Sequence, residues 1–245
     1  MPSSQNPYIA QSCRCYGYDV LDLAGKCSFP EVVYLLFRGE LPSSQEAELL
    51  EKLMIAFINP GPRNPASRAA MLAGVSKAAP SALLPIALNI FSGNHMGSGN
   101  VEMTVRFFRR NHKISPDKII DGYTDLNKKK TELVWEPIPG FGRRFGGIDE
   151  YIEKTASMIG ELSGSGKVFE WASAVAEKLH EFNMGWLATG VASAVLSDLG
   201  FHPKAAAGIY QLIAAPGLLA HGLETLGKPL TAMPFVPDED YIIER

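Results

Sequence analysis

Helix start and stop signals recur at short intervals along this chain, and they constrain its fold more than any other feature. Ser28-x-x-Glu31 is a capping-box pattern, Pro30 lies in the turn that would follow it, and Gly39 closes the apolar run behind them. The same start signal returns at residues 42–46, ahead of apolar residues at helical spacing. No stretch shows sustained period-2 alternation, the pattern of a half-buried strand. The sequence therefore predicts an all-α fold.

The remaining helices are expected between loops rich in Gly and Pro. Residues 59–65 and 135–149 must be loops, because prolines and glycines interrupt any helical pattern there. Pro216 should end or kink a helix, and the lysine run at 127–130 indicates a solvated loop. The expected helices after 42–57 are 67–79, 81–91, 101–110, 115–125, 150–161, 166–181, 184–199, 203–215 and 217–226.

Length and composition describe an ordinary globular protein. The 245 residues suit one large domain or two unequal ones, with 46% hydrophobic and 20% charged residues. The net charge of −3 excludes a strongly basic face, so nucleic acid and anionic membrane are not expected as partners. No apolar run reaches the roughly 20 residues that span a bilayer. The first residues lack a signal-peptide pattern, which favours the cytoplasm.

The cysteines fit reduced thiols better than a disulfide framework or a metal site. Their number is odd, and Cys13, Cys15 and Cys27 all lie near the N-terminus. Cys13-x-Cys15 has no second pair at ligand spacing, whereas structural zinc takes about four protein ligands. We therefore expect no metal.

Two glycine motifs resemble nucleotide-binding loops but lack essential parts. Gly166-Lys167 has Glu161 where a P-loop has its first Gly, and Val168 has no hydroxyl for magnesium. Residues 140–146 are one residue too long for a dinucleotide fingerprint, and no strand is expected before them. A glycine loop flanked by arginines can still hold a phosphate through backbone N–H groups and charge.

Three blocks together resemble citrate synthase and its relatives. The first covers residues 16–24 and 28–42, with the sequences YGYDVLDLA and SFPEVVYLLFRGELP. The second is PGFGRR at 139–144, with Asp149 behind it, and the third is GLLAHGLE at 217–224, followed by Lys228 and Tyr241. Their order and spacing match the family along nearly the whole chain. The short length is similar to that of stand-alone citryl-CoA lyases.

The resemblance implies an α-helical homodimer with the active site in a cleft. Residues 1–100 and 191–245 would form a large dimerisation domain, and 101–190 a smaller domain that binds coenzyme A. No tightly bound cofactor is implied; the ligands would be a coenzyme A thioester and a small carboxylate. Family members make or break a carbon–carbon bond next to the thioester carbonyl. This chemistry needs a carboxylate base and a hydrogen-bond donor to the thioester oxygen.

The resemblance also assigns roles to individual residues of this chain. His95 lies in the segment similar to the family's first histidine, and would donate to the thioester oxygen; otherwise it is a helix-terminal histidine bonded to backbone. Arg143 replaces the second histidine. An arginine stays protonated, so it would bind a carboxylate or phosphate, unless it is a salt-bridged loop residue. The glycine loop with Arg144 would contact coenzyme A, through the residues Gly140, Phe141, Gly142 and Gly146.

The catalytic aspartate of the family has no counterpart in its expected segment. Residues 182–190 contain no acid; Glu181 lies just before them, and Asp198 lies two to three helical turns later. Asn183 can hydrogen-bond a substrate but is not a base. Losing a base typically costs about 10²–10⁴ in rate.

Two residues near the C-terminal end complete the expected site. Lys228 would take the place of an arginine that the partner subunit supplies in the family. His221 would line the cleft or be a hydrogen-bonded core histidine. The leading hypothesis is a citryl-CoA lyase-like enzyme that acts by Claisen or retro-Claisen chemistry. The alternative is a catalytically degenerate homologue that binds an acyl-CoA or carboxylate, or serves as a partner subunit.

Overall fold

The computed structural model describes residues 12–127, 136–234 and 237, and the fold is all-α as expected. The Met1–Asn6 start, Lys128–Lys130 of the charge run and Tyr241 lie outside these residues. The helices, in chain order, are α1 (Val20–Lys26), α2 (Phe29–Arg38), α3 (Ser44–Ala56), α4 (Pro65–Val75), α5 (Pro80–Phe91), α6 (Val101–Asn111), α7 (Pro116–Asn127), α8 (Glu150–Gly160), α9 (Lys167–Leu179), α10 (Ala188–Asp198) and α11 (Pro203–Thr225). Short 3₁₀ turns lie at η1 (His180–Phe182) and η2 (Leu230–Ala232).

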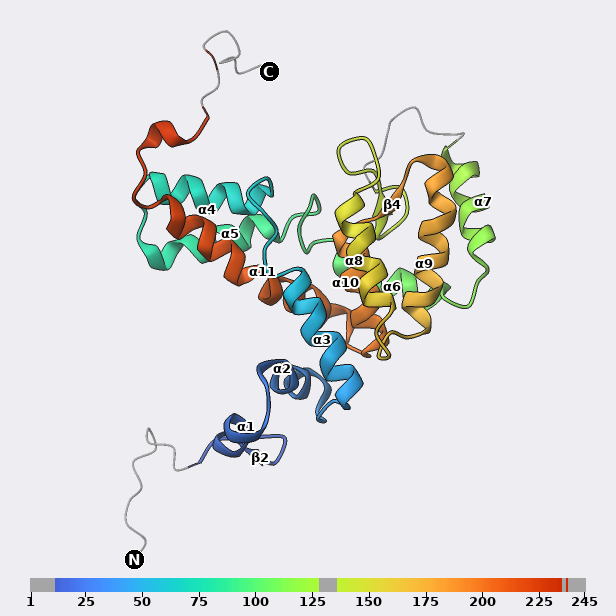
Figure 1. Ribbon diagram of the computed structural model, residues 1–245, viewed down its shortest axis with the longest axis horizontal. Helices are drawn as coiled ribbons and strands as arrows, with labels where there is room; N and C mark the ends of the chain where they lie inside the picture. Colours follow the sequence, from blue (N-terminus) through green and yellow to red (C-terminus); the bar gives the residue numbers. More distant parts are fainter. Residues whose placement is uncertain (1–11, 128–135, 235–236, 238–245) are drawn as a thin grey trace, which may run out of the picture.

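The helices gather into two groups joined by α11 (Figure 1). Helix α11 packs against α4 and α5, and the same helix also contacts α6, α10 and α3. The second group comprises α6 to α10, in which α10 packs on α6 and α9, and α7 packs on α9. The N-terminal α1 and α2 extend away from both groups (Figure 1). The expected domain division at residues 100 and 190 stays a prediction.

The capping signals read from the sequence form at the ends of the first helices. The carboxylate of Glu31 accepts hydrogen bonds from the N–H and Oγ of Ser28, and Gly39 ends α2 in the left-handed conformation. Ser43 and Glu46 form the same box at the start of α3. These local contacts fix where α2 and α3 begin, and hence where the loop after α3 enters the cleft described below.

Two expected helix boundaries are wrong. The helix expected over 184–199 begins only at Ala188, because β4 (Gly185–Trp186) pairs antiparallel with β3 (Phe141–Gly142). The helices expected over 203–215 and 217–226 are one helix that continues through Pro216. Pro216 has no N–H, and the N–H of Gly217 bonds to Ile58 O at 3.1 Å. The chain after α3 therefore packs directly on the backbone of α11 at this point.

The fold also contains two short strands near the N-terminus and one long apolar helix. β1 (Arg14–Cys15) and β2 (Tyr18–Asp19) form a small hairpin before α1, which the pattern of the sequence did not predict. By length and composition α11 could cross a membrane, although its packing against α4, α5 and α6 is that of a central core helix. The three cysteines are free thiols.

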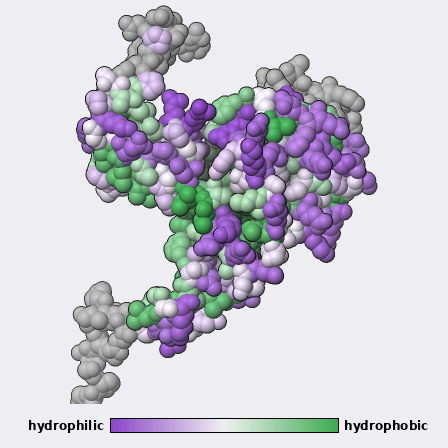
Figure 2. Space-filling view, viewed as in Figure 1, coloured by the Kyte–Doolittle hydropathy of each residue, from purple (hydrophilic) through white to green (hydrophobic). Residues whose placement is uncertain are grey.

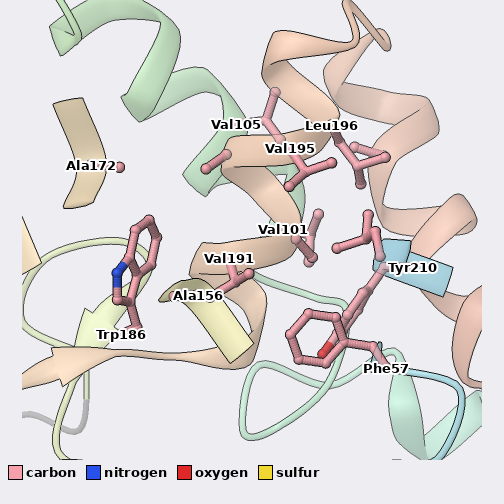
Figure 3. Packing of buried hydrophobic residues seen from close by; sticks show 14 of the residues in the cluster. Phe57, Val101, Val105, Ala156, Ala172, Trp186, Val191, Val195, Leu196 and Tyr210 are labelled. Carbon is pink, nitrogen blue, oxygen red and sulfur yellow. The ribbon is translucent and has the colours of Figure 1, made fainter. Parts of the chain in front are cut away.

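One continuous hydrophobic core runs through both groups of helices (Figure 3). Val101 and Val105 of α6 face Val191 and Val195 of α10, and all four side chains are fully buried. Trp186 packs on Phe169 and Phe141. At the other end Phe57 contacts Tyr210 edge-on, with 6.2 Å between the ring centroids. This last pair connects the core to the wall of the cleft.

Candidate functional site

A cleft of about 730 Å³ opens between the loop after α3 and the N-terminal part of α8. It appears in Figure 2 as the hollow between the two groups of helices. Its charged lining is mixed: Arg63, Arg144 and Lys154 are cationic, and Glu136, Asp149 and Glu150 are acidic. A cleft of this size, with a few convergent charged groups, is typical of a binding site for a small molecule.

The floor of the cleft depends on a close approach between two glycines. Gly140 has a φ of 86°, which favours glycine, and a Cβ there would lie 2.7 Å from the ring of Phe108. A Cβ at Gly190 would overlap the carbonyl oxygen of Gly140. The N–H of Leu187 bonds to that same oxygen at 3.0 Å. The glycine turn is thus held against the start of α10.

Beyond β3 the chain makes a tight turn at the edge of the cleft. Arg144 and Gly147 exchange backbone hydrogen bonds of 2.9 and 3.2 Å, and Phe145 and Gly146 between them have φ values of 51° and 90°. The Phe145 ring is 72% exposed, and the Arg144 guanidinium carbon lies 5.5 Å from its centroid. This turn presents both side chains to the cleft.

Arg144 lines the cleft as the sequence suggested, and it is paired with an acid. Its Nη1 lies 2.6 Å from Oδ2 of Asp149, whose other oxygen accepts from the N–H groups of Tyr151 and Ile152 at the start of α8. The Nε of Arg144 is buried and has no hydrogen-bond partner among the described residues. The contact with Asp149 thus leaves this nitrogen of the guanidinium unsatisfied within the described residues.

Arg143 and Asn183 lie behind the glycine turn. The Nη2 of Arg143 donates to Phe182 O at 2.8 Å, and the side chain of Asn183 donates to Gly146 O at 3.1 Å. Among the described residues, neither is part of the cleft lining. Both side chains thus hydrogen-bond between the glycine turn and the segment before β4. The ligand-binding roles expected for Arg143 and Asn183 stay predictions.

The side chain of Phe141 belongs to the core. Its ring is 0% exposed and packs on Phe108 and Trp186, with centroids 5.5 and 5.0 Å apart. The ring therefore anchors β3 in the core, and a contact of Phe141 with coenzyme A stays a prediction. Gly142 is also buried, in its pairing with Gly185.

His95 lies in the loop between α5 and α6, on an exposed part of the chain. Its neighbours Asn94 and Met96 line the cleft, whereas His95 itself is not among the described lining residues. The loop is tightly folded, since a Cβ at Gly97 would overlap carbonyl oxygens of the same loop. Among the influences on Glu136, burial raises the pKa of its carboxyl, and His95 contributes the smallest of the effects that lower it.

Glu136 is the residue of the cleft that sequence reasoning missed. Its Oε1 accepts from the N–H of Gly140 at 2.6 Å, and its Oε2 accepts from Nδ2 of Asn100 at 2.5 Å. Burial raises its pKa above the usual 4.5, while the two hydrogen bonds lower it. The only sequence signal was an acid four residues before the first glycine of the 140–147 loop.

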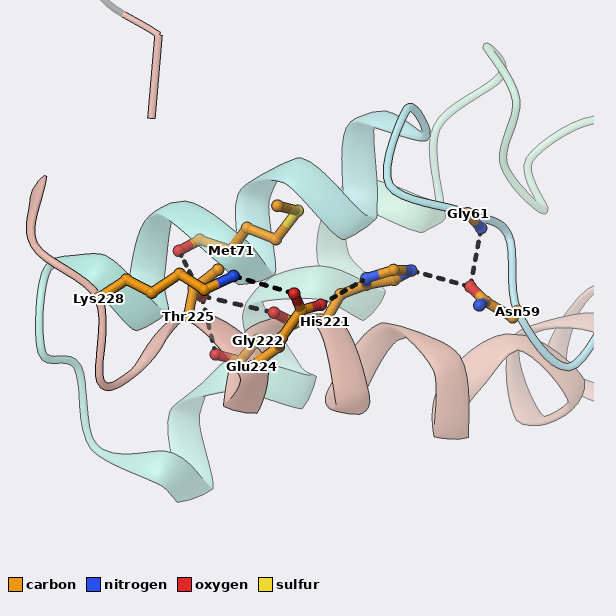
Figure 4. Close-up of polar contacts among 8 residues, drawn as sticks. All are labelled: Asn59, Gly61, Met71, His221, Gly222, Glu224, Thr225 and Lys228. Carbon is orange, nitrogen blue, oxygen red and sulfur yellow. Dashed lines mark hydrogen bonds and ion pairs between the residues drawn. The ribbon is translucent and has the colours of Figure 1, made fainter. Parts of the chain in front are cut away.

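His221 orients a residue of the cleft wall rather than lining the cleft (Figure 4). Its Nε2 lies 2.9 Å from Oδ1 of Asn59, which also accepts from the N–H of Gly61 at 2.9 Å. Asn59 and Gly61 both line the cleft. His221 therefore holds the loop after α3 in place, at the point where α11 meets it.

Lys228 lies at the far end of α11 in the described part of the chain. Its Nζ is 2.9 Å from Oε1 of Glu224, one helical turn earlier (Figure 4). A role in the cleft of a partner subunit stays a prediction.

The acids near the expected aspartate position form hydrogen bonds to the protein backbone. Asp198 accepts from the N–H groups of Gly166, Val168 and Phe169, and so caps the start of α9. The Oε1 of Glu153 accepts from Trp186 N at 2.8 Å, and a Cβ at Gly185 would overlap this oxygen. Within the described residues, no group of three or more His, Cys, Asp or Glu side chains could hold a metal ion.

Comparisons with known proteins agree with this fold. Residues 4–95 match the family model of the citrate synthase C-terminal domain. A segment of 36 residues is 53% identical to 2-methylcitrate synthase from Mycobacterium tuberculosis, and covers 15% of this chain but only 9% of that enzyme. The chain therefore matches a small part of that relative.

Solved structures resemble the chain over almost its whole length. Citryl-CoA lyase from Hydrogenobacter thermophilus superimposes with a TM-score of 0.79 at 26% identity, over 97% of this chain and 91% of that one. ATP citrate lyase from Methanothrix soehngenii, in complex with citrate and coenzyme A, gives 0.74 at 18% identity, over 94% of this chain and 39% of that one. Citrate synthase from Thermoplasma acidophilum gives 0.66 at 17% identity, over 89% and 58%.

The chain thus has a citrate synthase-like fold, and its residues 4–95 resemble the citrate synthase C-terminal domain. In length and architecture the chain is similar to citryl-CoA lyase, as the three sequence blocks implied.

Proposed function

We propose that this chain binds a coenzyme A thioester in the cleft and makes or breaks a carbon–carbon bond next to the thioester carbonyl. The reaction that the similarity to citryl-CoA lyase favours is cleavage of citryl-CoA to acetyl-CoA and oxaloacetate. The observation that carries the proposal is the placement of Glu136, a largely buried carboxylate beside the His95 loop, in a cleft that also contains three cations.

The cations suit the charges of such a substrate. Coenzyme A carries phosphates, and citryl-CoA adds carboxylates. Arg63 and Lys154 lie in different walls of the cleft, on the loop after α3 and on α8, with Arg144 on the turn. Guanidinium groups bind carboxylates and phosphates through paired N–H donors, and lysine adds charge without this directionality. We assign Arg144 and the 140–147 turn to the coenzyme A side.

His95 is our candidate for the donor that stabilises the enolate oxygen of the thioester. The side chain extends from a glycine-rich loop whose other residues, Asn94 and Met96, line the cleft. A hydrogen-bond donor at this oxygen is typically worth about 10²–10³ in rate. His95→Gln keeps a hydrogen-bond donor at the position, and His95→Ala removes it. The two variants therefore distinguish the effect of the hydrogen bond from the effect of side-chain volume.

The alternative, a binding protein without catalysis, has one observation in its favour. No acid is present in the 182–190 segment, and the space in front of Gly185 holds the carboxylate of Glu153. An ordinary citrate synthase reaction that takes its base from the 182–190 segment is therefore not available.

Incubation with citryl-CoA separates the two functions. We expect acetyl-CoA release that follows saturation kinetics, and a loss of about 10²-fold or more in His95→Ala. Saturable binding of coenzyme A without turnover supports the binding protein instead. Neither binding nor turnover overturns both. Lys204→Ala, an exposed lysine at the start of α11, is the control for changes of net charge.

The homodimer that the resemblance implies is also a proposal. The first helices carry large exposed apolar side chains, with Leu21 82% and Phe29 63% exposed, and Leu36 and Phe37 about half exposed. In Figure 2 hydrophobic residues gather at this end of the molecule. Such a patch is typical of a protein–protein contact. Sedimentation of the full chain at micromolar concentration tests it: a monomer mass overturns the proposal.

A further inference from the structure

We propose that Glu136 is the proton-transfer residue of this cleft and replaces the acid that residues 182–190 lack. The inference rests on the proposed function and names the group that would carry its central step. Three structural observations support it: the position of the carboxylate, the way it is held, and the tasks of the other acids.

The position brings the carboxylate to the point where both halves of the site meet. Glu136 lines the cleft together with Asn94 of the histidine loop and Arg144 of the glycine turn. The Nδ2 of Asn100 joins these parts, because it donates both to Glu136 and, at 3.2 Å, to Asn94 O. A thioester bound beside Asn94 of the histidine loop would therefore lie next to Glu136.

Two hydrogen bonds fix the carboxylate without using all of its acceptor sites. Among the described residues, each oxygen accepts one hydrogen bond, from Gly140 N and from Asn100 Nδ2 respectively. A carboxylate has about four lone-pair sites, so each oxygen keeps one for a substrate proton. A fixed and desolvated base needs little reorganisation when the proton moves.

The other acids near the cleft are committed elsewhere. Asp149 is paired with Arg144 and caps α8, and Glu150 is exposed in the first turn of that helix. Glu153 bonds to Trp186 N and lies 3.5 Å from His180, beside a separate cavity of about 190 Å³. Among the described acids that line the cleft, Glu136 is thus the one that is partly buried and forms no ion pair with a described lysine or arginine.

The electrostatic surroundings hold the pKa of the Glu136 carboxyl above its usual value. Burial is the largest effect on the pKa of Glu136 and raises it, and the donors Gly140 and Asn100 partly offset this. His95 is the titratable neighbour that acts on it, and the other charged lining groups are Arg63, Arg144, Asp149, Glu150 and Lys154. A base is most effective when its pKa lies near the working pH.

In the cleavage direction the carboxylate of Glu136 takes the proton from the β-hydroxyl of the acyl chain. The O–H electron pair forms the keto C=O, the carbon–carbon bond breaks, and its electron pair moves into the thioester as an enolate. The protonated Glu136 then delivers the same proton to the enolate carbon. The products are a keto acid and a shortened acyl-CoA, and Glu136 returns to its ionised form. No further reactant is needed.

Glu136→Gln tests this step in the full chain with citryl-CoA. We expect turnover to fall by about 10²–10⁴-fold, while the Kd for coenzyme A changes by less than about threefold. Glu136→Asp should retain more activity than Glu136→Gln, because it keeps a carboxylate. Glu102→Gln, an acid at the start of α6 that pairs with Arg106, is the matched control and should keep wild-type turnover.

A second measurement follows the proton itself. Acetyl-CoA incubated in D₂O with oxaloacetate should exchange methyl protons in the wild type, and this exchange should be lost in Glu136→Gln. Wild-type rates of cleavage and exchange in Glu136→Gln overturn the role of Glu136 but leave the proposed function intact. A wild type that neither cleaves citryl-CoA nor exchanges protons overturns the proposed activity itself. If Glu136→Gln keeps the wild-type kcat but binds coenzyme A more weakly, Glu136 only holds the glycine turn in place. This result also overturns the proposal.

Discussion

The side-chain amide of Asn100 donates a hydrogen bond to the carboxylate of Glu136, with 2.5 Å between Nδ2 and Oε2. Asn100 stands at the N-cap position of α6, directly after the histidine loop, and Glu136 precedes the glycine turn. The bond therefore connects two segments that are 36 residues apart and that both reach the cleft. A ligand that displaces one segment would therefore also displace the other.

Asn100→Ala should shift the pH dependence of turnover to higher pH. The amide stabilises the ionised form of Glu136, so its loss raises the pKa of that carboxyl further. A hydrogen bond to a charged group contributes roughly 1.5–3 kcal/mol, which corresponds to about one to two pH units. The measurement is kcat for citryl-CoA cleavage from pH 5 to 9.

Asn111→Ala is the matched control for this shift. Its Nδ2 donates to Phe107 O at 2.7 Å at the opposite end of α6, away from Glu136. It should leave the pH profile unchanged. An identical profile in Asn100→Ala and wild type contradicts the prediction.

Glu136→Gln should become more stable relative to the wild type as pH rises. In the folded protein burial raises the pKa of Glu136 above 4.5, so the native state holds this proton more tightly than the unfolded chain does. The stability that the group contributes is present below its unfolded pKa and is lost as pH rises through its folded pKa. Glutamine does not titrate. Thermal unfolding at pH 4, 5, 6 and 7 should therefore show a difference in Tm that grows in favour of the variant, and a constant difference would refute this.

Most of the helices could be predicted because their signals are local. The capping box at Ser28 and Glu31, and the one at Ser43 and Glu46, depend on residues three positions apart. The wrong helix boundaries lie where contacts between residues far apart in the sequence determine the structure. Pro216 lies within a continuous α11 because the backbone at Ile58 takes the N–H of Gly217, a partner that no local pattern reveals.

The site was less predictable for the same reason. Motif positions located the 140–147 turn and the His95 loop, but they could not show that Phe141 is buried or that Arg143 donates to Phe182 O. Glu136 carries no motif, and its environment exists only once Asn100 and Gly140 surround it.

Gly190→Ala should destabilise the protein and weaken coenzyme A binding together. The added Cβ would overlap the carbonyl oxygen of Gly140, so the glycine turn must move away from α10. Backbone displacements of this kind cost about 1–3 kcal/mol. We expect a lower Tm and a Kd raised at least several-fold by calorimetry.

Gly208→Ala tests whether the Gly190→Ala effect comes from steric overlap. Gly208 lies in the interior of α11, and a Cβ there would contact nothing within 4 Å. Alanine favours a helix by about 1 kcal/mol over glycine. Gly208→Ala should therefore be as stable as the wild type or more so, with unchanged binding; equal losses in both variants would argue against the close approach as the cause.

Asp198→Asn should reduce stability and leave catalysis unchanged. The carboxylate accepts three backbone N–H groups at the start of α9, and an asparagine turns its amide donor toward some of them. We expect the free energy of unfolding in urea to fall by about 1–3 kcal/mol. Asp117→Asn, an exposed acid paired with Lys178, should change it little. A large fall in kcat in Asp198→Asn would instead assign the catalytic acid to this position.

His221→Ala should weaken substrate binding more than it slows the chemical step. The lost contact is the one between Nε2 and Oδ1 of Asn59, which holds the loop after α3 against α11. A hydrogen bond of this type contributes about 0.5–1.5 kcal/mol, so KM should rise about twofold to tenfold with kcat nearly constant. His202→Ala removes a histidine at the other end of the same helix, where it caps the first turn. His202→Ala should keep wild-type KM. His221 Nδ1 also lies 3.8 Å from Oε2 of Glu224, outside the cleft wall. Because the contact with Asn59 is the one that reaches the cleft wall, Asn59→Ala in the His221→Ala background should add little to the rise in KM, and a fully additive double variant would show that the two side chains act separately.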